Sequence, residues 1–407
     1  MYRVLLSLFF AYLVLPTYAQ TDQSHVLLIS FDGFRADYVQ KFQPPNFLKF
    51  IEEGAQAEAL VPSYPSKTFP NHYTLVTGLY PGHHGLVDNT FLDPGRDVIY
   101  KMSKSDLVKD PYFYGGFPLW QWVQEYSMKS ASYFWVGSEA PIKGRYPDIY
   151  NRYDGSVPNT QRVKTVLQWF SMPDSARPRF VSLYFSLVDS EGHRSGPDSE
   201  GIKEAVLEAD RLLGQLMNGL NRFPFSVNVI ITSDHGMYKM EKKPDTHISM
   251  SKVLEGLPQD LRVLENGTHV HIFVPDDQEV QKIYETLTER ETNFKAYRRE
   301  NTPVPWHYRD SDRIGDIFLV AHAGHVFRGA GGFGSFRSAV WGTHGFDPYL
   351  TPEMNGILYA RGPGIKKGAR IGPLENIHVF PLVTELLGLP LPAIDGKVSA
   401  IQPLLQE

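Results

Sequence analysis

Six aspartate and histidine side chains lie in four short motifs whose composition suits divalent cations. They are Asp32 in SFDG, Asp189 and His193 in LVDSEGH, Asp234 and His235 in TSDHG, and His344 in GTHG. Taken singly, such an aspartate more often caps a turn or a helix. Together, carboxylates and imidazoles suit Zn²⁺ or a similar ion. The set is large enough for two ions, which at about 4 Å apart clamp an in-line displacement at phosphorus.

A candidate nucleophile lies in the segment PSYPSKTFPNHYTLVTG at 62–78. Pro62, Pro65 and Pro70 indicate a loop held in one shape around Thr68, and the run HYTLVTGLY beyond it predicts the start of a helix or a buried turn. Taken alone, a threonine at such a junction is usually a packing or capping residue. Beside a bound cation its hydroxyl would have a lowered pKa and would be a nucleophile.

Three apolar runs without alternation, at 25–32, 179–189 and 228–236, are typical of parallel strands buried on both faces, and each ends in an aspartate or reaches one. Helical patterns separate or follow them, at 44–54, 119–127, 159–171, 200–220 and 378–389. This alternation predicts an α/β fold with a doubly wound, mostly parallel sheet flanked by helices. Ligands of such sheets bind beyond the carboxyl ends of the strands, which would bring the aspartates together.

The segment 251–336 has a different pattern, with short strands around one amphipathic helix, and predicts a small α+β insertion subdomain. The catalytic core would then comprise 20–250 and 337–407. The glycine-rich stretch at 328–336 lacks the strand-to-helix setting of a phosphate-binding loop and is interpreted as a mobile loop.

Bulk composition excludes several classes of protein. The 407 residues carry a net charge of −5 without a basic run, which argues against a polymeric nucleic acid as partner. Residues 1–19 resemble a secretory signal peptide, with an uncleaved anchor as the alternative, and no later segment is apolar enough to span a membrane. The chain has no cysteine, which argues against a formylglycine sulfatase and favours a periplasmic or secreted bacterial protein.

The ordered motifs FDG, PSYPSKTFPNHYTLVTGLYPGHHGLVDN, FWVGSEA, YNRYDGSVP, YFSLVDSEGHRSGP, ITSDHGM and WGTHGF resemble those of the nucleotide pyrophosphatase/phosphodiesterase family of the alkaline phosphatase superfamily. The resemblance covers about 25–390. It implies two zinc ions, one held by Asp189, His193 and His344. The other would be held by Asp32, Asp234 and His235, with Thr68 touching it as the nucleophile.

The resemblance also implies residues that contact the substrate. Asn89 would donate its amide to a phosphate oxygen, and Phe69, Tyr153 and Tyr184 would line the substrate pocket. Core packing is the alternative for Tyr184, which alternates with Asp189 along the predicted strand. Whether Lys67, beside the nucleophile, contacts substrate stays open. The chain lacks the cysteine-rich domains of animal members and is expected to be a bare catalytic domain of the bacterial type.

These features predict hydrolysis of a nucleotide phosphodiester or phosphoanhydride through a phosphothreonine intermediate, with release of a nucleoside 5′-monophosphate. The main alternative is a choline or lipid head-group phosphodiesterase of the same fold. A monoesterase is less favoured, because a neutral amide such as that of Asn89 suits a diester. A metal- or phosphate-binding protein without catalysis would need the ligands but not Thr68.

Overall fold

The computed structural model describes residues 24–329 and 339–406. The expected signal peptide and most of the glycine-rich stretch at 328–336 lie outside these ranges. Among the described residues, no helix combines the length and the apolar character needed to cross a membrane.

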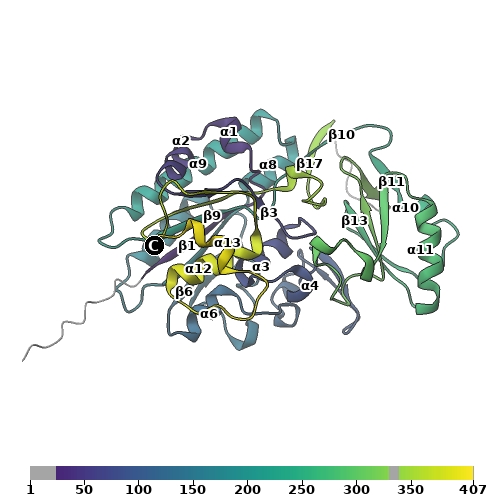
Figure 1. The fold of residues 1–407 in the computed structure, drawn as a ribbon, viewed down its shortest axis with the longest axis horizontal. Coiled ribbons are helices and arrows are strands. Elements are labelled where there is room, and N and C mark those ends of the chain that lie inside the picture. The colour runs from purple at the N-terminus through teal and green to yellow at the C-terminus, as the bar shows by residue number, and fades with distance from the viewer. Residues whose placement is uncertain (1–23, 330–338, 407) are drawn as a thin grey trace, which may run out of the picture.

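The larger part of the molecule is built on one eight-stranded sheet (Figure 1). Its neighbouring strands from β9 through β1, β8 and β6 to β7 are parallel, whereas β18 is antiparallel to β9 and to β2. In sheet order the strands are β19 (Arg370–Ile371), β2 (Ala55–Ala57), β18 (Leu358–Arg361), β9 (Asn228–Thr232), β1 (Val26–Phe31), β8 (Phe180–Phe185), β6 (Ser130–Tyr133) and β7 (Ile149–Asn151). The predicted mostly parallel α/β sheet is confirmed.

Helices cover both faces of this sheet, and β1 shows why. All six of its residues are buried, and they alternate between two hydrophobic clusters: Val26 and Leu28 face one, Leu27 and Ile29 the other. The first cluster is closed by α3 (Thr68–Thr77), α6 (Leu119–Glu125) and α12 (Val379–Leu387). The second is closed by α2 (Pro45–Glu52), α7 (Asn159–Phe170) and α9 (Glu200–Leu220).

One predicted strand is too long. The run 179–189 was interpreted as a strand ending at Asp189, but β8 ends at Phe185 and α8 (Leu187–Ser195) begins two residues later. Asp189 therefore lies in the first turn of a helix. Leu187 and Val188 extend the apolar run, and an apolar run of this length does not distinguish a strand from the start of a buried helix.

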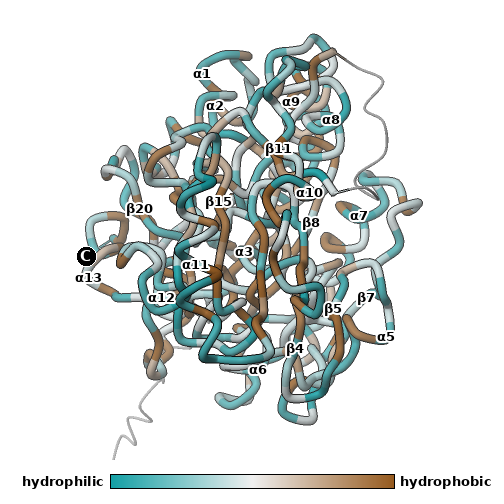
Figure 2. Tube along the Cα trace, turned by 90° about the vertical axis from the view of Figure 1, so that its right-hand side faces the viewer, coloured by the Kyte–Doolittle hydropathy of each residue, from teal (hydrophilic) through white to brown (hydrophobic). Residues whose placement is uncertain are grey.

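A second sheet lies to one side of the core, at the right of Figure 1. Its four antiparallel strands are ordered β12 (Arg262–Glu265), β13 (His269–Phe273), β15 (Ile317–Ala321) and β14 (Phe294–Arg298), and α11 (Val280–Glu289) packs against it. Figure 2 shows the hydrophobic stretches concentrated along inner strands such as β15.

The paired strands β10 (Tyr238–Glu241) and β17 (Val340–Thr343) lead into and out of this sheet. The hydrophobic cluster of the sheet includes Met240 and Met354, beyond both expected boundaries. The division of the chain at 251 and 336 stays a prediction. The insertion subdomain comprises the four-stranded sheet β12-β13-β15-β14 and the segments that connect its strands.

Candidate metal centre

The three aspartates meet at the carboxyl ends of adjacent strands. Asp32 directly follows β1, Asp234 is separated from the end of β9 by one residue, and Asp189 lies in α8 after β8. The backbone N–H of Asp189 donates to the carbonyl of Asp32 at 2.9 Å, and that of Gly33 donates to Asp234 Oδ1 at 3.2 Å. Gly33 has φ of +68°, and a Cβ there would lie 2.8 Å from Asp189 Cα, so that only glycine permits this close approach.

The three histidines of the motifs share one orientation. Each places Nδ1 2.8 to 2.9 Å from a backbone carbonyl, which can only accept, so Nδ1 carries a proton and, in the neutral ring, Nε2 keeps its lone pair. The acceptors are Gly342 for His193, Gly236 for His235 and Ser66 for His344. A carbonyl that fixes the tautomer in this way is the usual second partner of a metal-ligating histidine.

The free Nε2 atoms face carboxylate oxygens. Nε2 of His193 lies 3.3 Å, and Nε2 of His344 3.9 Å, from Asp189 Oδ1. Nε2 of His235 lies 3.1 Å from Asp234 Oδ2 and 3.5 Å from Asp32 Oδ1. A nitrogen lone pair and a carboxylate oxygen at these distances repel each other unless a proton or a metal cation lies between them.

Unpaired carboxylate oxygens are a second observation that fits a site for divalent cations. Among the described residues, Asp32 Oδ1, Asp189 Oδ1 and Asp234 Oδ2 are buried atoms that accept no hydrogen bond. Buried polar atoms are rarely left unpaired in proteins. Burial and the charges of Asp234 and Asp189 raise the pKa of Asp32 well above its ordinary value. A bound cation would give these oxygens a partner and would offset the repulsion between the carboxylates.

The ligand atoms form overlapping groups, each within 4.8 Å. One group is the predicted set of Asp189, His193 and His344. Asp189 also groups with Asp32 and His235, and Asp32 and Asp234 group with His72. The clusters are consistent with a site for two metal ions, while the division of ligands between the ions stays a prediction.

His72 was not predicted from the sequence. It lies one turn after Thr68 in α3, is fully buried, and places Nδ1 3.0 Å from the Thr68 carbonyl and 3.3 Å from Asp234 Oδ2. Its Nε2 lies 2.8 Å from the Ser30 hydroxyl. His72 therefore connects α3, the helix that begins at Thr68, to the carboxylate of Asp234.

Thr68 is the first residue of α3, and its Oγ1 lies 3.2 Å from His235 Nε2. The structure thus places the hydroxyl beside the metal-ligand cluster. The first N–H groups of a helix have no intrahelical acceptor and, with the positive end of the helix dipole, favour an anion at this end.

The orientation of the Asn89 amide is set by its neighbour. Asn89 Oδ1 accepts from the backbone N–H of Phe69 at 2.9 Å. Because the oxygen is used in this way, the NH₂ group is the part of the amide that remains to donate to a ligand. Asn89 thus lies beside the residue that follows Thr68, and its role as an oxyanion donor stays a prediction.

The remaining predicted side chains lie around the same site in different ways. The Tyr184 hydroxyl donates to Asp32 Oδ2 at 2.7 Å, so this residue orients a candidate ligand as well as lying near Tyr153, whose ring centroid is 6.3 Å away. Tyr153 is 55% exposed, and Phe69 is half-buried. Lys67 donates to the carbonyl of His344 at 3.0 Å, and so holds the backbone of this candidate ligand. Contact of these residues with substrate is not tested by the geometry.

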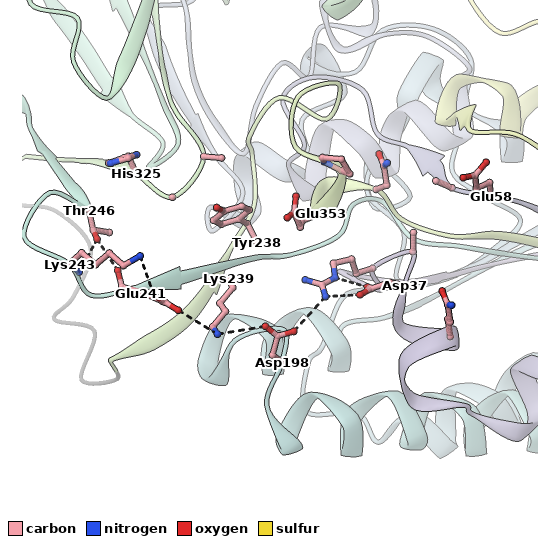
Figure 3. A pocket seen from close by; sticks show the side chains of 18 of the residues that line it. Asp37, Glu58, Asp198, Tyr238, Lys239, Glu241, Lys243, Thr246, His325 and Glu353 are labelled. Atoms are coloured by element: carbon pink, nitrogen blue, oxygen red, sulfur yellow. Dashed lines mark hydrogen bonds and ion pairs between the residues drawn. The ribbon is translucent and has the colours of Figure 1, made fainter.

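A separate cavity of about 980 Å³ is shown in Figure 3. Several of its charged side chains pair with one another: Asp198 lies between Arg35 and Lys239, and Lys239 also pairs with Glu241. The six aspartate and histidine ligands of the motifs do not line it. We therefore place the chemistry at the carboxylate and imidazole cluster rather than in this cavity.

Residues 26–347 match the family model described as type I phosphodiesterase/nucleotide pyrophosphatase. The chain belongs to this family. The family is one of hydrolases, and the α/β fold of the chain is the one that the sequence predicted.

Relatives of this chain include a venom phosphodiesterase of Crotalus durissus collilineatus, 34% identical over 394 residues, which are 95% of this chain and 47% of that protein. Family member 7 of Rattus norvegicus is 32% identical over 95% of this chain and 89% of its own length. The chain spans about half the length of most of the curated relatives it matches, as for rat family member 3, at 44%.

Among solved structures, murine ectonucleotide pyrophosphatase/phosphodiesterase 5 superposes with a TM-score of 0.85 at 29% identity, covering 94% of this chain and 100% of that one. That structure is of an inactive threonine-to-alanine variant in complex with AMP. The human protein 5 is 30% identical, with the same TM-score.

Proposed function

We propose that this chain is a two-zinc nucleotide phosphodiesterase and pyrophosphatase that works through a phosphothreonine intermediate. The observation that carries the proposal is the arrangement of three Nε2 lone pairs and three unpaired carboxylate oxygens beside the Thr68 hydroxyl. The ligands of the two ions are those expected from the sequence. Bound zinc would lower the pKa of the Thr68 hydroxyl and offset the charge of the phosphate.

Thr68 is the attacking group. As the bond from Oγ1 to phosphorus forms, the bond to the leaving oxygen breaks, the electron pair departs with that oxygen, and the hydroxyl proton passes to solvent. Water then attacks the same phosphorus, the Oγ1–phosphorus bond breaks, and the threonine is regenerated. The products are a nucleoside 5′-monophosphate and the second alcohol or phosphate.

Asn89 supplies a neutral donor for charge that develops on a non-bridging oxygen. A fixed donor of this kind contributes about 3 kcal/mol to the transition state, because it needs no reorientation during the reaction. A neutral amide suits a diester, whose phosphate carries less charge than a monoester. The contact from Phe69 N to Asn89 Oδ1 supports this role, since it holds the amide in the donating orientation.

The relatives support a nucleotide substrate. AMP is bound in the structure of murine protein 5, and several sequence relatives are named as nucleotide pyrophosphatases or venom phosphodiesterases. A choline or lipid head-group diester is the outcome that would redirect the assignment.

A kinetic comparison on three substrates tests the proposal. The purified enzyme with zinc is expected to hydrolyse an aryl ester of a nucleoside 5′-monophosphate with a much larger kcat/KM than glycerophosphocholine or an aryl phosphate monoester. Turnover mainly of glycerophosphocholine would assign the head-group activity. Equal rates on diester and monoester would contradict the role given to Asn89.

Tyr153→Ala adds a probe of the base. A nucleobase stacked on an aromatic ring gains about 1–3 kcal/mol. Since the exposed Tyr153 ring is available for stacking, the variant is expected to lose about tenfold in kcat/KM on the nucleotide ester. A bis-aryl phosphate without a base is the control and should be affected little. An equal loss on both substrates would assign Tyr153 to the fold.

We also propose that the protein is exported to a bacterial periplasm or secreted. The apolar run from Val4 to Leu15 after Arg3 supports this location, as does a sequence without cysteine. N-terminal sequencing of the protein recovered outside the cytoplasm is expected to begin at Gln20. A mature protein that keeps its first residues would indicate an anchor instead.

A further inference from the structure

A second buried cluster lies directly beside Asn89, centred on the carboxylate of Asp88. Asp88 Oδ2 accepts from Asn266 Nδ2 at 2.8 Å, from His271 Nε2 at 3.2 Å, and from His269 Nε2. Asp88 Oδ1 accepts from the backbone N–H of Asn89 at 2.6 Å. Asp88 and both histidines are fully buried, and Asn266 is 8% exposed.

All three side-chain donors come from the insertion subdomain. His269 and His271 alternate along β13 and so share one face of that strand, and Asn266 lies in the turn between β12 and β13. The insertion subdomain also binds Val87, the residue before Asp88, because the Tyr308 hydroxyl donates to the carbonyl of Val87 at 2.9 Å. Segment 87–89 is therefore attached to the insertion subdomain through the backbone carbonyl of Val87 and through the side chain of Asp88.

The hydrogen bonds distinguish this cluster from the metal centre, although its three ligand atoms also lie within 4.8 Å of one another. Both carboxylate oxygens of Asp88 accept hydrogen bonds, whereas each aspartate of the metal centre leaves a buried oxygen unpaired. His271 Nδ1 faces the backbone N–H of Gly315 at 3.4 Å, which leaves the proton on Nε2, pointing at Asp88. Donors directed at an oxygen in this way disfavour a cation there.

The charges agree with a hydrogen-bonded carboxylate. Burial lowers the pKa of His269 to about 4, so the ring is neutral near pH 7 and has one N–H to donate. For Asp88, burial opposes ionisation, but His269 and His271 more than offset it and hold the pKa below the ordinary value. An ionised Asp88 that accepts the N–H of a neutral His269 ring is consistent with both directions.

We propose that Asp88, Asn266, His269 and His271 form a clamp that positions the Asn89 amide over the reacting phosphate. The insertion subdomain is then part of the phosphodiesterase machinery, and its clamp residues are positioning residues that do not touch substrate. The inference rests on the proposed function, because it assigns to Asn89 the role of transition-state donor.

A misplacement of about 1 Å at a reacting centre costs as much as 100-fold in rate. Asn89 is held through its backbone N–H by Asp88 and through Oδ1 by Phe69, so both ends of the residue are fixed. Loss of a clamp donor would loosen the Asp88 carboxylate that makes the first of these attachments. The expected consequence is a fall in kcat, with KM changed little.

A double-mutant cycle tests the clamp. His269→Phe removes one donor to Asp88 and keeps a ring, and His269→Gln restores an N–H near the position of Nε2. Phe318→Leu is the matched control, since the Phe318 ring packs 5.2 Å from His269 and its side chain has no hydrogen-bond donor. Each change is made with Asn89 present and with Asn89→Ala, and kcat, KM, Tm and metal content are measured on a nucleotide aryl diester.

With Asn89 present, His269→Phe is expected to lower kcat about tenfold or more with KM within about twofold, and His269→Gln is expected to recover most of the loss. In the Asn89→Ala background, His269→Phe is expected to change kcat less than about twofold, because the group it positions is gone. Phe318→Leu should lower Tm but not kcat.

Three results would overturn the clamp: the same fold-loss in kcat in both backgrounds, a lower Tm with unchanged kcat, or a third bound ion that disappears with His269→Phe. If His269→Phe does not fold, Asn266→Ala, at the edge of the cluster, enters the same cycle with the same criteria. Failure of the proposed function gives a different result, namely no wild-type turnover of the diester, or turnover that Asn89→Ala leaves unchanged.

Discussion

Replacing Thr68 with alanine is expected to lower kcat for a nucleotide diester by about 10³-fold or more, because a covalent route through this hydroxyl is removed outright. The ligands of both ions apart from the hydroxyl remain, so the variant should still hold about two zinc ions per chain. Steady-state kinetics and metal analysis of the same preparation measure the two effects together.

Thr68→Ser is the matched control. It keeps a hydroxyl at the first residue of α3 and loses only a methyl group, so it should retain measurable turnover and accumulate the phosphorylated enzyme. A Thr68→Ala enzyme with more than about a tenth of wild-type kcat would refute the nucleophile assignment.

Asp189→Asn is expected to have the second largest effect. Asp189 Oδ1 is the common neighbour of His193 and His344, and the backbone of Asp189 is bonded to that of Asp32. An amide fills the same space but lacks the charge that offsets a divalent cation. We expect the metal content to fall toward one tightly held ion per chain and kcat to fall about 10²-fold or more, since both ions stabilise the transition state.

Asp210→Asn offers a control of equal size at another buried aspartate. The Asp210 carboxylate accepts from the backbone N–H groups of Asn46 and Phe47 at the start of α2, away from the ligand cluster. This variant should lose stability, seen as a lower Tm, while keeping two ions and wild-type kcat. Two tightly held ions in Asp189→Asn would exclude Asp189 from the metal centre.

Much of the architecture follows from local sequence. The runs that form β1 and β9 are continuous and apolar because both faces of these strands are covered, and α9 begins and ends at the residues its pattern indicated. The end of β8 could not be predicted from the sequence, since Leu187 and Val188 suit a buried helix as well as a strand. The placement of Asp189 in a helix required the tertiary structure.

The metal-ligand residues were predictable because they sit in short motifs, whereas their orientation was not. The carbonyls that fix the tautomers of His193 and His344 come from residues about 150 and 280 positions away along the chain. Tyr184 shows the same limit. Its alternation with Asp189 left core packing as an alternative, but its hydroxyl reaches Asp32 at the end of the neighbouring strand.

The cluster around Asp88 was missed entirely, because it joins positions about 180 residues apart. A signal was present in the HVHIF sequence of β13, where His269 and His271 recur at the two-residue period of a strand and so share a face. Two histidines on one face of a strand indicate a polar partner across an interface. They do not identify that partner.

The central position of β1 has a consequence for biosynthesis. This strand is made early, but its neighbours β8 and β9 begin at Phe180 and Asn228. At about 5–20 residues per second, the ribosome needs roughly 7–30 s to reach Phe180 after finishing β1. During that interval VLLISF, six uncharged residues without proline, has the composition of an aggregation-prone segment and no native strand to pair with. Nascent chains are therefore expected to depend on a holdase chaperone that covers this segment until β8 has been synthesised.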